Sequence, residues 1–335
     1  MSRGKHVDQH LLGEMRRHLQ ANGISPRPLG PGETADEALL RYLRARNLSP
    51  EKAAAMYAGT VRWRDENDID ELRKCTGAEA LGSSSVETLR KFLPHAQTGF
   101  DCVGGPVIFK HMGVHCKIRQ AVSEGISLDA LARYNIWLNE QYMDALASAN
   151  AREWSVIVDA AGWHVGLFDS YGFRFLKRTA TTDAAHYPDL LRQMIVVNAP
   201  PMLAYAWRVI RTWLDAETRE KIDILSEGNP ERAREVLLSR FDPKTLPAQY
   251  GGSAPPLPSW PERAGLPPAK ITAAAGTAAA TGTAAPASAT ASSASSVHES
   301  NVNAVELRTT PRDTSDRTSK GVMKTVYVEI VPQLS

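Results

Sequence analysis

The sequence predicts an α/β fold in which a helical segment precedes a layer of strands alternating with helices. From about residue 95, short runs rich in β-branched residues alternate with longer segments of helical periodicity. Strands separated by helices of this length usually pair in parallel, within one sheet that the helices cover. The preceding third of the chain carries helix signals, and no internal repeat is visible.

Two helices joined by a tight turn are expected in the N-terminal third. Thr34 and Glu37 form a capping box ahead of the run ALLRYLRARN. Ser49 and Pro50 then restart a helix, with serine as the N-cap and proline at the first helical position. The two helices therefore form a hairpin.

The elements of the α/β part follow from changes in periodicity. We expect strands at residues 107–109, 154–162 with a turn at the end, 194–197 and 221–225. We expect helices at residues 128–149, 167–185, 202–214 and 229–241. The last helix has Asn229 as its N-cap and Pro230 at its first position.

The composition divides the chain into three regions. We expect a helical subdomain at residues 1–75, the α/β domain at 76–254 and a mostly disordered tail at 255–335. From Thr272 to Ser296 no large side chain occurs, so burial cannot offset the entropy of ordering. The alternation within residues 321–335 is typical of a strand, which would be unstable alone.

Charge and cysteine content limit the class of protein. A net charge of +2 over 335 residues gives no overall field that would attract nucleic acid. Cys75, Cys102 and Cys116 fit reduced cytosolic thiols better than a disulfide scaffold. We see no secretory signal and no apolar run long enough to span a bilayer. We therefore expect a cytoplasmic protein whose membrane contact is peripheral.

No catalytic motif stands out. The patterns GxSxG, GxxxxGK[ST] and GxGxxG are absent, which removes the main support for a hydrolase, a P-loop protein or a dinucleotide-binding enzyme. A phosphatase loop at Cys116 would need an arginine six residues later, where Val122 stands. Possible zinc ligands are Cys102, His111, His115 and Cys116. A possible catalytic triad is Asp159, His164 and Ser170.

Neither of these sets has a distinctive spacing. A structural zinc site usually contains a CxxC knuckle, and none occurs here. Asp159 follows a buried strand and is better placed to bond the backbone of the turn after it. We therefore expect no enzyme, no metal and no cofactor.

The predicted helix at residues 202–214 is apolar on nearly every side. Its strongly polar members are Arg208, Arg211 and Thr212, whereas a helix on a water-soluble core normally keeps a polar outer face. One explanation is that the helix lies inside the core. The other is that it forms a lid over an apolar pocket at a membrane surface, where long arginines reach lipid phosphate.

Three segments together resemble the Sec14 (CRAL-TRIO) lipid-binding and transfer family. They are ALLRYLRARNLSPEKAAAMYAGTVRWR, YPDLLRQMIVVNAPPMLAYAWRVIRTWLDAETREKIDIL and LPAQYGG, in the family order between about residues 35 and 253. The resemblance implies the Sec14/CRAL-TRIO fold, with a helical N-terminal subdomain packed on an α/β lobe. The sheet of that lobe would floor a hydrophobic cavity for one lipid, and the helix after the NAP strand would be its gate.

The resemblance also assigns roles around the gate. The residues expected to form the gate and cavity wall are Met202, Leu203, Ala206, Trp207, Ile210, Trp213 and Leu214. Arg208 would assist docking to anionic lipid. Gly251 and Gly252 would act either as a hinge or as an ordinary turn.

Phosphatidylinositol is the ligand that the resemblance favours. In similar exchange proteins an acid after the YP pair and a lysine in the gate helix hold the inositol phosphate, and the matching residues are Asp189 and Arg211. The alternative is a structural ion pair between these two residues. Arg46, in the LRAR helix, would be a further headgroup residue. Trp154 and Val156 stand where choline-lipid binders use hydroxyl residues, which favours phosphatidylinositol over phosphatidylcholine.

Two other classes of function stay open at this point. One is a carrier of another apolar ligand, such as a tocopherol, retinoid or sterol. The other is a protein-interaction module that transfers nothing. The expected partners are phosphatidylinositol or a related phospholipid, and a transient membrane surface of the Golgi, endoplasmic reticulum or endosomes. A lipid kinase or a small GTPase would be a protein partner, and we expect a monomer.

Overall fold

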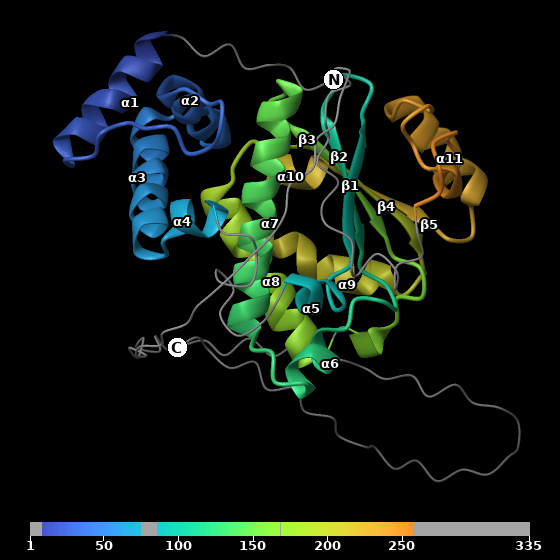
Figure 1. The fold of residues 1–335 in the computed structure, drawn as a ribbon. Coiled ribbons are helices and arrows are strands. Elements are labelled where there is room, and N and C mark those ends of the chain that lie inside the picture. Colours follow the sequence, from blue (N-terminus) through green and yellow to red (C-terminus); the bar gives the residue numbers. More distant parts are fainter. Residues whose placement is uncertain (1–8, 75–85, 168, 258–335) are drawn as a thin grey trace, which may run out of the picture. The chain divides into compact units, whose positions relative to one another are not determined.

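The computed structural model describes residues 9–74, 86–167 and 169–257, and Cys75 and the predicted tail strand lie outside this part. Within it the predicted α/β class is confirmed, because five strands form one sheet in the order β1-β2-β3-β4-β5 (Figure 1). The strands are β1 (His95–Phe100), β2 (Pro106–His111), β3 (Trp154–Asp159), β4 (Leu191–Ala199) and β5 (Ile222–Ser226).

The pairing of the strands differs from the prediction at one edge. The strands β2 to β5 are parallel, as predicted, but β1 and β2 form an antiparallel pair. The segment between them, residues 101–105, is too short for a parallel crossover, which needs a dozen or more residues. No strand was predicted at the position of β1, because its sequence, HAQTGF, lacks the β-branched residues that are typical of the other strands.

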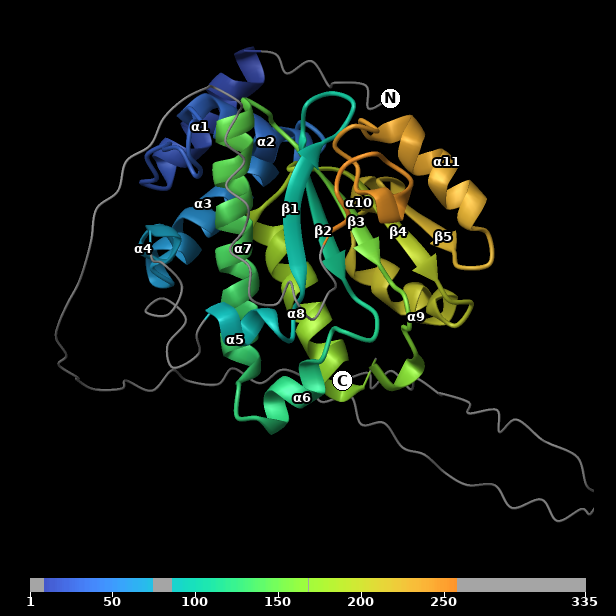
Figure 2. The same ribbon diagram turned by 45° about the vertical axis from the view of Figure 1, so that its right-hand side comes forward.

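Helices cover both faces of the sheet (Figure 1, Figure 2). The helices α7 (Leu128–Ala149) and α8 (Ser170–His186) lie on one face, and α11 (Pro230–Arg240) lies on the other. Side chains alternate between the faces along β3: Val156 and Val158 pack with the α7 and α8 cluster, whereas Ile157 packs with the α11 cluster. Both faces are therefore buried, as in other parallel sheets.

Shorter helices complete this lobe. They are α5 (Val86–Arg90), α6 (Ile118–Ser123), α9 (Leu203–Ile210) and α10 (Ala216–Glu220), with a 3₁₀ turn at Arg211–Trp213. The predicted helix at 202–214 is thus divided, since its last turn tightens into 3₁₀ geometry. Asn229 caps α11 as predicted, its side chain accepting from the Arg232 N–H.

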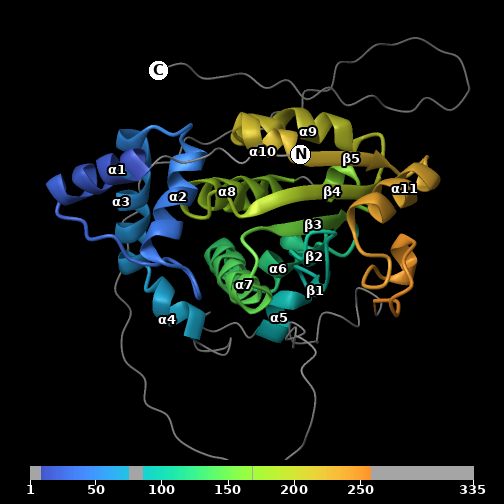
Figure 3. The same ribbon diagram turned by 90° about the horizontal axis from the view of Figure 1, so that it is seen from above.

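The N-terminal helices have a core of their own and group together in Figure 3. They are α1 (Gln9–Ala21), α2 (Ala35–Ala45) and α3 (Pro50–Glu66), followed by α4 (Ile69–Lys74). In their core the rings of Tyr42 and Tyr57 meet edge to face at 5.3 Å. The predicted capping box of Thr34 and Glu37 is confirmed. Ser49 precedes α3 as predicted, but its side chain makes no capping hydrogen bond.

A buried ion pair joins the N-terminal helices to the lobe. The guanidinium of Arg64 in α3 lies 2.8 Å from a carboxylate oxygen of Glu140 in α7. The hydroxyl of Tyr187 donates to the same carboxylate at 2.7 Å. Burial by itself opposes the charge on Arg64, but the hydrogen bonds and charge of Glu140 raise the pKa of Arg64 above its ordinary value. Arg64 also pairs with the more exposed Asp70 at 2.5 Å, whereas Arg64 is the cation that pairs with the fully buried Glu140. Breaking the buried pair is therefore expected to be destabilising.

Replacing Glu140 by alanine is expected to lower the free energy of unfolding by about 2–4 kcal/mol, because Arg64 would keep only Asp70 as a partner and the Tyr187 hydroxyl would lose its acceptor. Asp144→Ala, on the same helix, is the matched control, since its carboxylate pairs with Arg73 at 2.8 Å but is 43% exposed. That exposed pair is expected to contribute about 0–1 kcal/mol. Chemical denaturation measures both values, and equal losses would contradict the importance of the buried pair.

Candidate functional site

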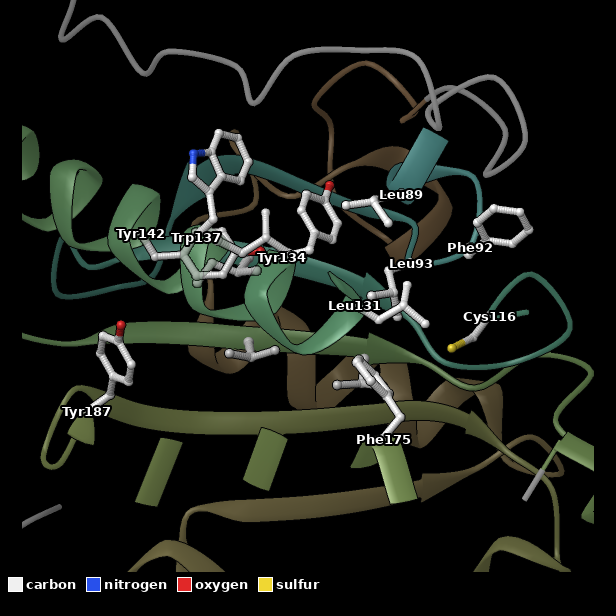
Figure 4. Packing of buried hydrophobic residues seen from close by; sticks show 14 of the residues in the cluster. Leu89, Phe92, Leu93, Cys116, Leu131, Tyr134, Trp137, Tyr142, Phe175 and Tyr187 are labelled. Atoms are coloured by element: carbon white, nitrogen blue, oxygen red, sulfur yellow. The ribbon is translucent and has the colours of Figure 1, made fainter. Parts of the chain in front are cut away.

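A cavity of about 380 Å³ lies between the sheet and the helices that cover it. Most of its wall is apolar, with contributions from Ile108, Leu138, Val156, Val158, Phe175, Leu176, Met194 and Val196. Figure 4 shows the surrounding hydrophobic cluster, in which Cys116, Tyr142, Phe175 and Tyr187 also line the cavity. An apolar space of this size with few polar groups is typical of a ligand site.

Helix α9 contributes one of its faces to the cavity wall. Leu203, Trp207 and Ile210 are spaced four and three residues apart, so they lie on the same side of the helix, and all three line the cavity. Leu214, beyond the 3₁₀ turn, lines it as well. These residues occupy the places predicted for the gate and cavity wall.

Three other residues predicted for the gate and wall lie outside the cavity lining. Met202 is 48% exposed and Ala206 is buried elsewhere on the helix. Trp213 packs edge to face on Phe173, with ring centroids 5.0 Å apart. These three residues are therefore not part of the cavity wall, because a helix can turn only one of its faces toward the cavity, and their role in a gate stays a prediction.

The outer face of α9 is exposed although it is apolar. Met202 and Tyr205 are 48% and 63% exposed, and the guanidinium carbon of Arg208 lies 5.6 Å from the centroid of the Tyr205 ring. This exposure excludes the explanation that the helix lies inside the core. An exposed apolar strip with a cation beside it suits contact with a lipid surface, and the docking role of Arg208 stays a prediction.

The cavity has a charged end at the N-terminal edge of β4 and β5. Asp189 precedes β4, Lys221 directly precedes β5, and both line the cavity together with Arg46. Because the two strands are parallel neighbours, their N-terminal ends lie side by side. The Lys221 ammonium lies 4.0 Å from one Asp189 oxygen and 3.4 Å from a Glu217 oxygen. The guanidinium of Arg44 lies 2.5 Å from the other Asp189 oxygen.

Arg211 is not part of this charged end. It begins the 3₁₀ turn after α9, its side chain is exposed, and the cavity wall does not include it. The ion pair considered between Arg211 and Asp189 is therefore wrong, because Arg44 of α2 holds that carboxylate instead. Lys221 was not among the headgroup residues expected from the sequence. Its position was informative, because Lys221 directly precedes β5 and Asp189 precedes β4, the parallel neighbour of β5.

The N-terminal helices position the loop that carries Asp189. Arg41 donates to the carbonyl oxygen of Pro188 at 3.0 Å, and the Tyr42 hydroxyl donates to that of His186 at 3.1 Å. Asp189 itself has a φ of 58°, in the left-handed region that residues other than glycine seldom adopt. Contacts from outside the lobe thus hold the carboxylate in a conformation that its own loop would not favour.

The two predicted hinge glycines lie in a packed turn. Gly251 has a φ of 92°, and a Cβ on Gly252 would overlap with the carbonyl oxygen of Leu246. The N–H of Ala254 donates to that same oxygen at 3.1 Å. This geometry is that of an ordinary turn, which was one of the two expectations, and the hinge role stays a prediction.

The other candidate catalytic groups lack the geometry of a reactive site. Burial raises the pKa of the Cys116 thiol to about 12, so the thiol stays protonated and is a poor nucleophile. Asp159 accepts from the Ala161 N–H at 3.0 Å, as predicted for the turn, and from the Tyr250 hydroxyl at 3.1 Å. Within residues 9–74, 86–167 and 169–257, no group of three or more His, Cys, Asp or Glu could hold a metal ion. No helix of that part is long and apolar enough to cross a membrane.

An apolar cavity with a charged end suits an amphipathic ligand that is kept away from water. In the comparison with protein families, residues 96–252 match the model described as the CRAL/TRIO domain. The resemblance inferred from the motifs is therefore confirmed over these residues.

Curated relatives cover most of the described part of the chain. The phosphatidylinositol/phosphatidylcholine transfer protein SFH9 of Arabidopsis thaliana is 27% identical over 233 residues, which are 67% of this chain and 38% of that protein. Protein real-time of Anopheles gambiae is 25% identical over 256 residues, which are 74% of this chain and 35% of that protein. The matches thus span somewhat more than a third of the length of these relatives.

A solved structure shares the fold. The crystal structure of Sfh5 matches with a TM-score of 0.51 and 19% sequence identity, over 68% of this chain and 83% of that chain. At this identity the likeness concerns the fold, and it agrees with the predicted Sec14/CRAL-TRIO architecture.

Cys116 should react far more slowly than Cys102 in the native protein, because Cys102 is exposed whereas Cys116 is buried at the cavity wall with a raised pKa. With a thiol-alkylating reagent near about pH 8, we expect a difference of about tenfold or more that disappears after denaturation. Peptide mass mapping measures each rate. Rapid native labelling of Cys116 would contradict its enclosed position.

Proposed function

We propose that this chain binds one phospholipid, with phosphatidylinositol as the preferred ligand, and transfers it between membranes or presents it at one. The observation that carries the proposal is the cavity, whose apolar interior ends at Arg46, Asp189 and Lys221. An amphipathic ligand with a phosphate at one end matches this distribution of apolar and charged side chains. No catalytic step is part of the proposal.

The apolar interior would supply the free energy for holding acyl chains. Each methylene group removed from water contributes about 0.8 kcal/mol. A lipid with two long chains would therefore leave such a cavity for another apolar phase, but not for water. A membrane is that phase, which is why the proposed activity is exchange at membranes.

The charged end suits an inositol phosphate. Lys221 and Arg46 supply positive charge, and both side-chain types bind phosphate well. The Asp189 carboxylate is an acceptor for the hydroxyl groups of the inositol ring. The headgroup residues of the proposal are thus Asp189, Lys221 and Arg46, with Lys221 in place of Arg211.

Similarity to named transfer proteins supports the class of ligand. Relatives described as phosphatidylinositol/phosphatidylcholine transfer proteins match 67% and 64% of this chain. Phosphatidylcholine is the less favoured of the two lipids, because Trp154 and Val156 line the cavity and offer no hydroxyl group.

Helix α9 would act as the gate of the cavity. Its inner residues Leu203 and Trp207 would contact the bound lipid. Its outer residues Met202 and Tyr205 would enter the membrane surface, with Arg208 beside anionic headgroups. The proposal places the protein in the cytoplasm, at membrane surfaces, as a monomer that hands its lipid to a membrane or to a lipid kinase.

A carrier of a different apolar ligand is the second candidate. A sterol, retinoid or tocopherol would fill the apolar interior without using the charged end. An interaction module with a shrunken cavity is disfavoured by the volume of about 380 Å³. Lipid extraction of the purified protein distinguishes these cases, since it recovers a phospholipid, another lipid or nothing.

Lys221→Met is expected to lower phosphatidylinositol transfer between vesicles by about tenfold or more, because a charge-assisted hydrogen bond to phosphate would be lost. Arg211→Met is the matched control, since its exposed side chain lies outside the cavity wall, and its transfer rate is expected to stay close to that of the wild type. Thermal unfolding of both variants checks that the fold is intact. Loss of transfer in Arg211→Met with normal transfer in Lys221→Met would overturn this headgroup assignment.

The double substitution Met202→Ser with Tyr205→Ser is expected to weaken vesicle binding and slow transfer, because it removes apolar surface that would enter the membrane. The content of lipid bound at equilibrium should stay unchanged, since neither residue lines the cavity. Vesicle sedimentation and mass spectrometry of bound lipid measure the two quantities. Unchanged vesicle binding would argue against α9 as the docking surface.

A further inference from the structure

Polar side chains gather in the otherwise apolar interior of the cavity, away from the charged end. This interior polar cluster consists of His95 in β1, Lys110 in β2, Tyr142 in α7 and Asp183 in α8, all of which line the cavity. His95 and Lys110 are directly paired across β1 and β2, so their side chains lie on the same face of the sheet. The sheet and the two helices that cover one of its faces therefore bring polar groups to one place.

The cluster lies deep in the cavity relative to the charged end. Lys110 is level with Val158 of β3, which is level with Val196 of β4. Val196 comes five residues after Leu191, where β4 begins at the charged end. At the usual rise of a strand, this places Lys110 about 16 Å along the sheet from the start of β4. It is about 10 Å from the level of Lys221, which precedes Ile222 opposite Met194.

Each member of the cluster has unused hydrogen-bonding capacity within the described residues. The Nε2 of His95 and the hydroxyl of Tyr142 are buried and have no hydrogen-bond partner there. Asn135 and Asn139 donate to the same oxygen of Asp183, at 3.1 and 2.7 Å, which leaves its other oxygen without a donor in the described part of the chain.

Lys110 is the remaining member of the cluster. Its ammonium nitrogen lies 5.6 Å from the centroid of the Tyr142 ring, and no described carboxylate lies within ion-pair distance of it. Buried polar groups are normally satisfied. The unused oxygen of Asp183 and the ammonium of Lys110, whose side chains line the cavity, therefore indicate a polar group of a ligand or a water molecule between them.

The two ionisable members of the cluster that carry charge, Lys110 and Asp183, have opposite charges. Burial lowers the pKa of Lys110 and raises that of Asp183 to about 6, and in each case the attraction of the other group opposes the shift. Burial also lowers the pKa of His95 to about 3, so this ring is neutral. Its Nδ1 lies 3.1 Å from the Leu93 carbonyl oxygen and carries the hydrogen, which makes Nε2 an acceptor.

A charge-balanced set of donors and acceptors suits a neutral group that both donates and accepts. An ionised group would add an uncompensated charge inside the cavity. Arg90 lies buried near His95 and Tyr142 but does not line the cavity, so a phosphate at the cluster would meet one lining cation, Lys110. At the charged end, Arg46 and Lys221 both line the cavity. A hydroxyl group can accept from Lys110 and donate to Asp183.

We propose that the interior polar cluster binds a hydroxyl group carried by the apolar part of the ligand. The inference rests on the proposed function, because it describes a lipid in the same cavity. A plain acyl chain at this point would displace bound water without replacing its hydrogen bonds, whereas a hydroxyl group replaces them. The hydroxyl has two sources, a hydroxylated acyl chain of a phospholipid or a compact apolar alcohol such as a sterol.

Competition between matched lipids tests the proposal on the wild-type protein. One arm offers vesicles with equal amounts of phosphatidylinositol with two plain chains and of phosphatidylinositol with a hydroxyl near the middle of one chain. A second arm offers a sterol and its analogue without the hydroxyl. Mass spectrometry of the bound lipid gives the ratio, and a preference for the hydroxylated partner of about tenfold is expected in one of the arms.

Substitutions then assign the preference to the cluster. Lys110→Met and Asp183→Asn are each expected to bring the ratio close to one, because each removes a charge-assisted partner of the hydroxyl. Lys117→Met is the matched control, since Lys117 is exposed and lies outside the cavity wall, and it should keep the wild-type ratio. The wild-type comparison stands even where a variant folds poorly.

Each outcome of the competition bears on the proposal. Equal uptake of both partners in both arms would overturn it, as would a preference that survives Lys110→Met and Asp183→Asn. A cluster-dependent preference for a zwitterionic phospholipid over both hydroxylated lipids would also overturn it. Uptake of plain phosphatidylinositol without preference leaves the proposed function standing. Uptake of the sterol alone supports the cluster and counts against phosphatidylinositol, and no uptake at all contradicts both.

Discussion

The hold of the N-terminal helices on the loop between α8 and β4 is the constraint on which the site depends. In this loop, Arg41 donates to the carbonyl oxygen of Pro188, and Arg44 donates to the carboxylate of Asp189. At the end of α8, the hydroxyls of Tyr42 and Thr60 donate to the carbonyl oxygens of His186 and Ala185. The ring of Trp63 stacks on that of His186 with centroids 3.9 Å apart. The buried ion pair of Arg64 in α3 and Glu140 in α7 is a further contact between the N-terminal helices and the lobe. The helical subdomain is therefore part of the ligand site, because it aims the Asp189 carboxylate at the cavity.

The charged end and the interior polar cluster lie at different positions along the parallel strands that line the cavity. The N-terminal ends of β4 and β5 gather groups that water and ions can reach, including Lys221 with a side chain 14% exposed. Farther along the strands, Lys110 and Asp183 are desolvated, and burial opposes the charge on each. Keeping such groups inside a lipid-sized cavity costs stability unless a ligand or water satisfies them. The interior cluster is thus best understood as a means of selecting a ligand.

The composition of α9 agrees with its proposed role as a gate. A helix of a water-soluble protein usually has one apolar stripe, but α9 has an apolar inner face at the cavity and an apolar outer face in contact with solvent. Both faces have a use if the helix alternates between a bound lipid and a membrane. The exposed side chains of Met202 and Tyr205 would otherwise reduce solubility without any gain.

Local signals in the sequence determined much of the fold. The capping box at Thr34, the cap at Asn229 and the period of residues 128–149 each depend on neighbours within a few turns, and the structure has all three. The motifs around residues 202–214 identified the family, and the apolar character of this segment suggested the proposed gate. The tertiary structure decided which charges meet. Arg44 reaches Asp189 across 145 residues, Lys221 replaces Arg211 at the charged end, and Lys110 faces Asp183 inside the cavity. Periodicity reports which side of a helix or strand is buried, but not which distant side chain lies opposite, because that depends on how separate elements pack.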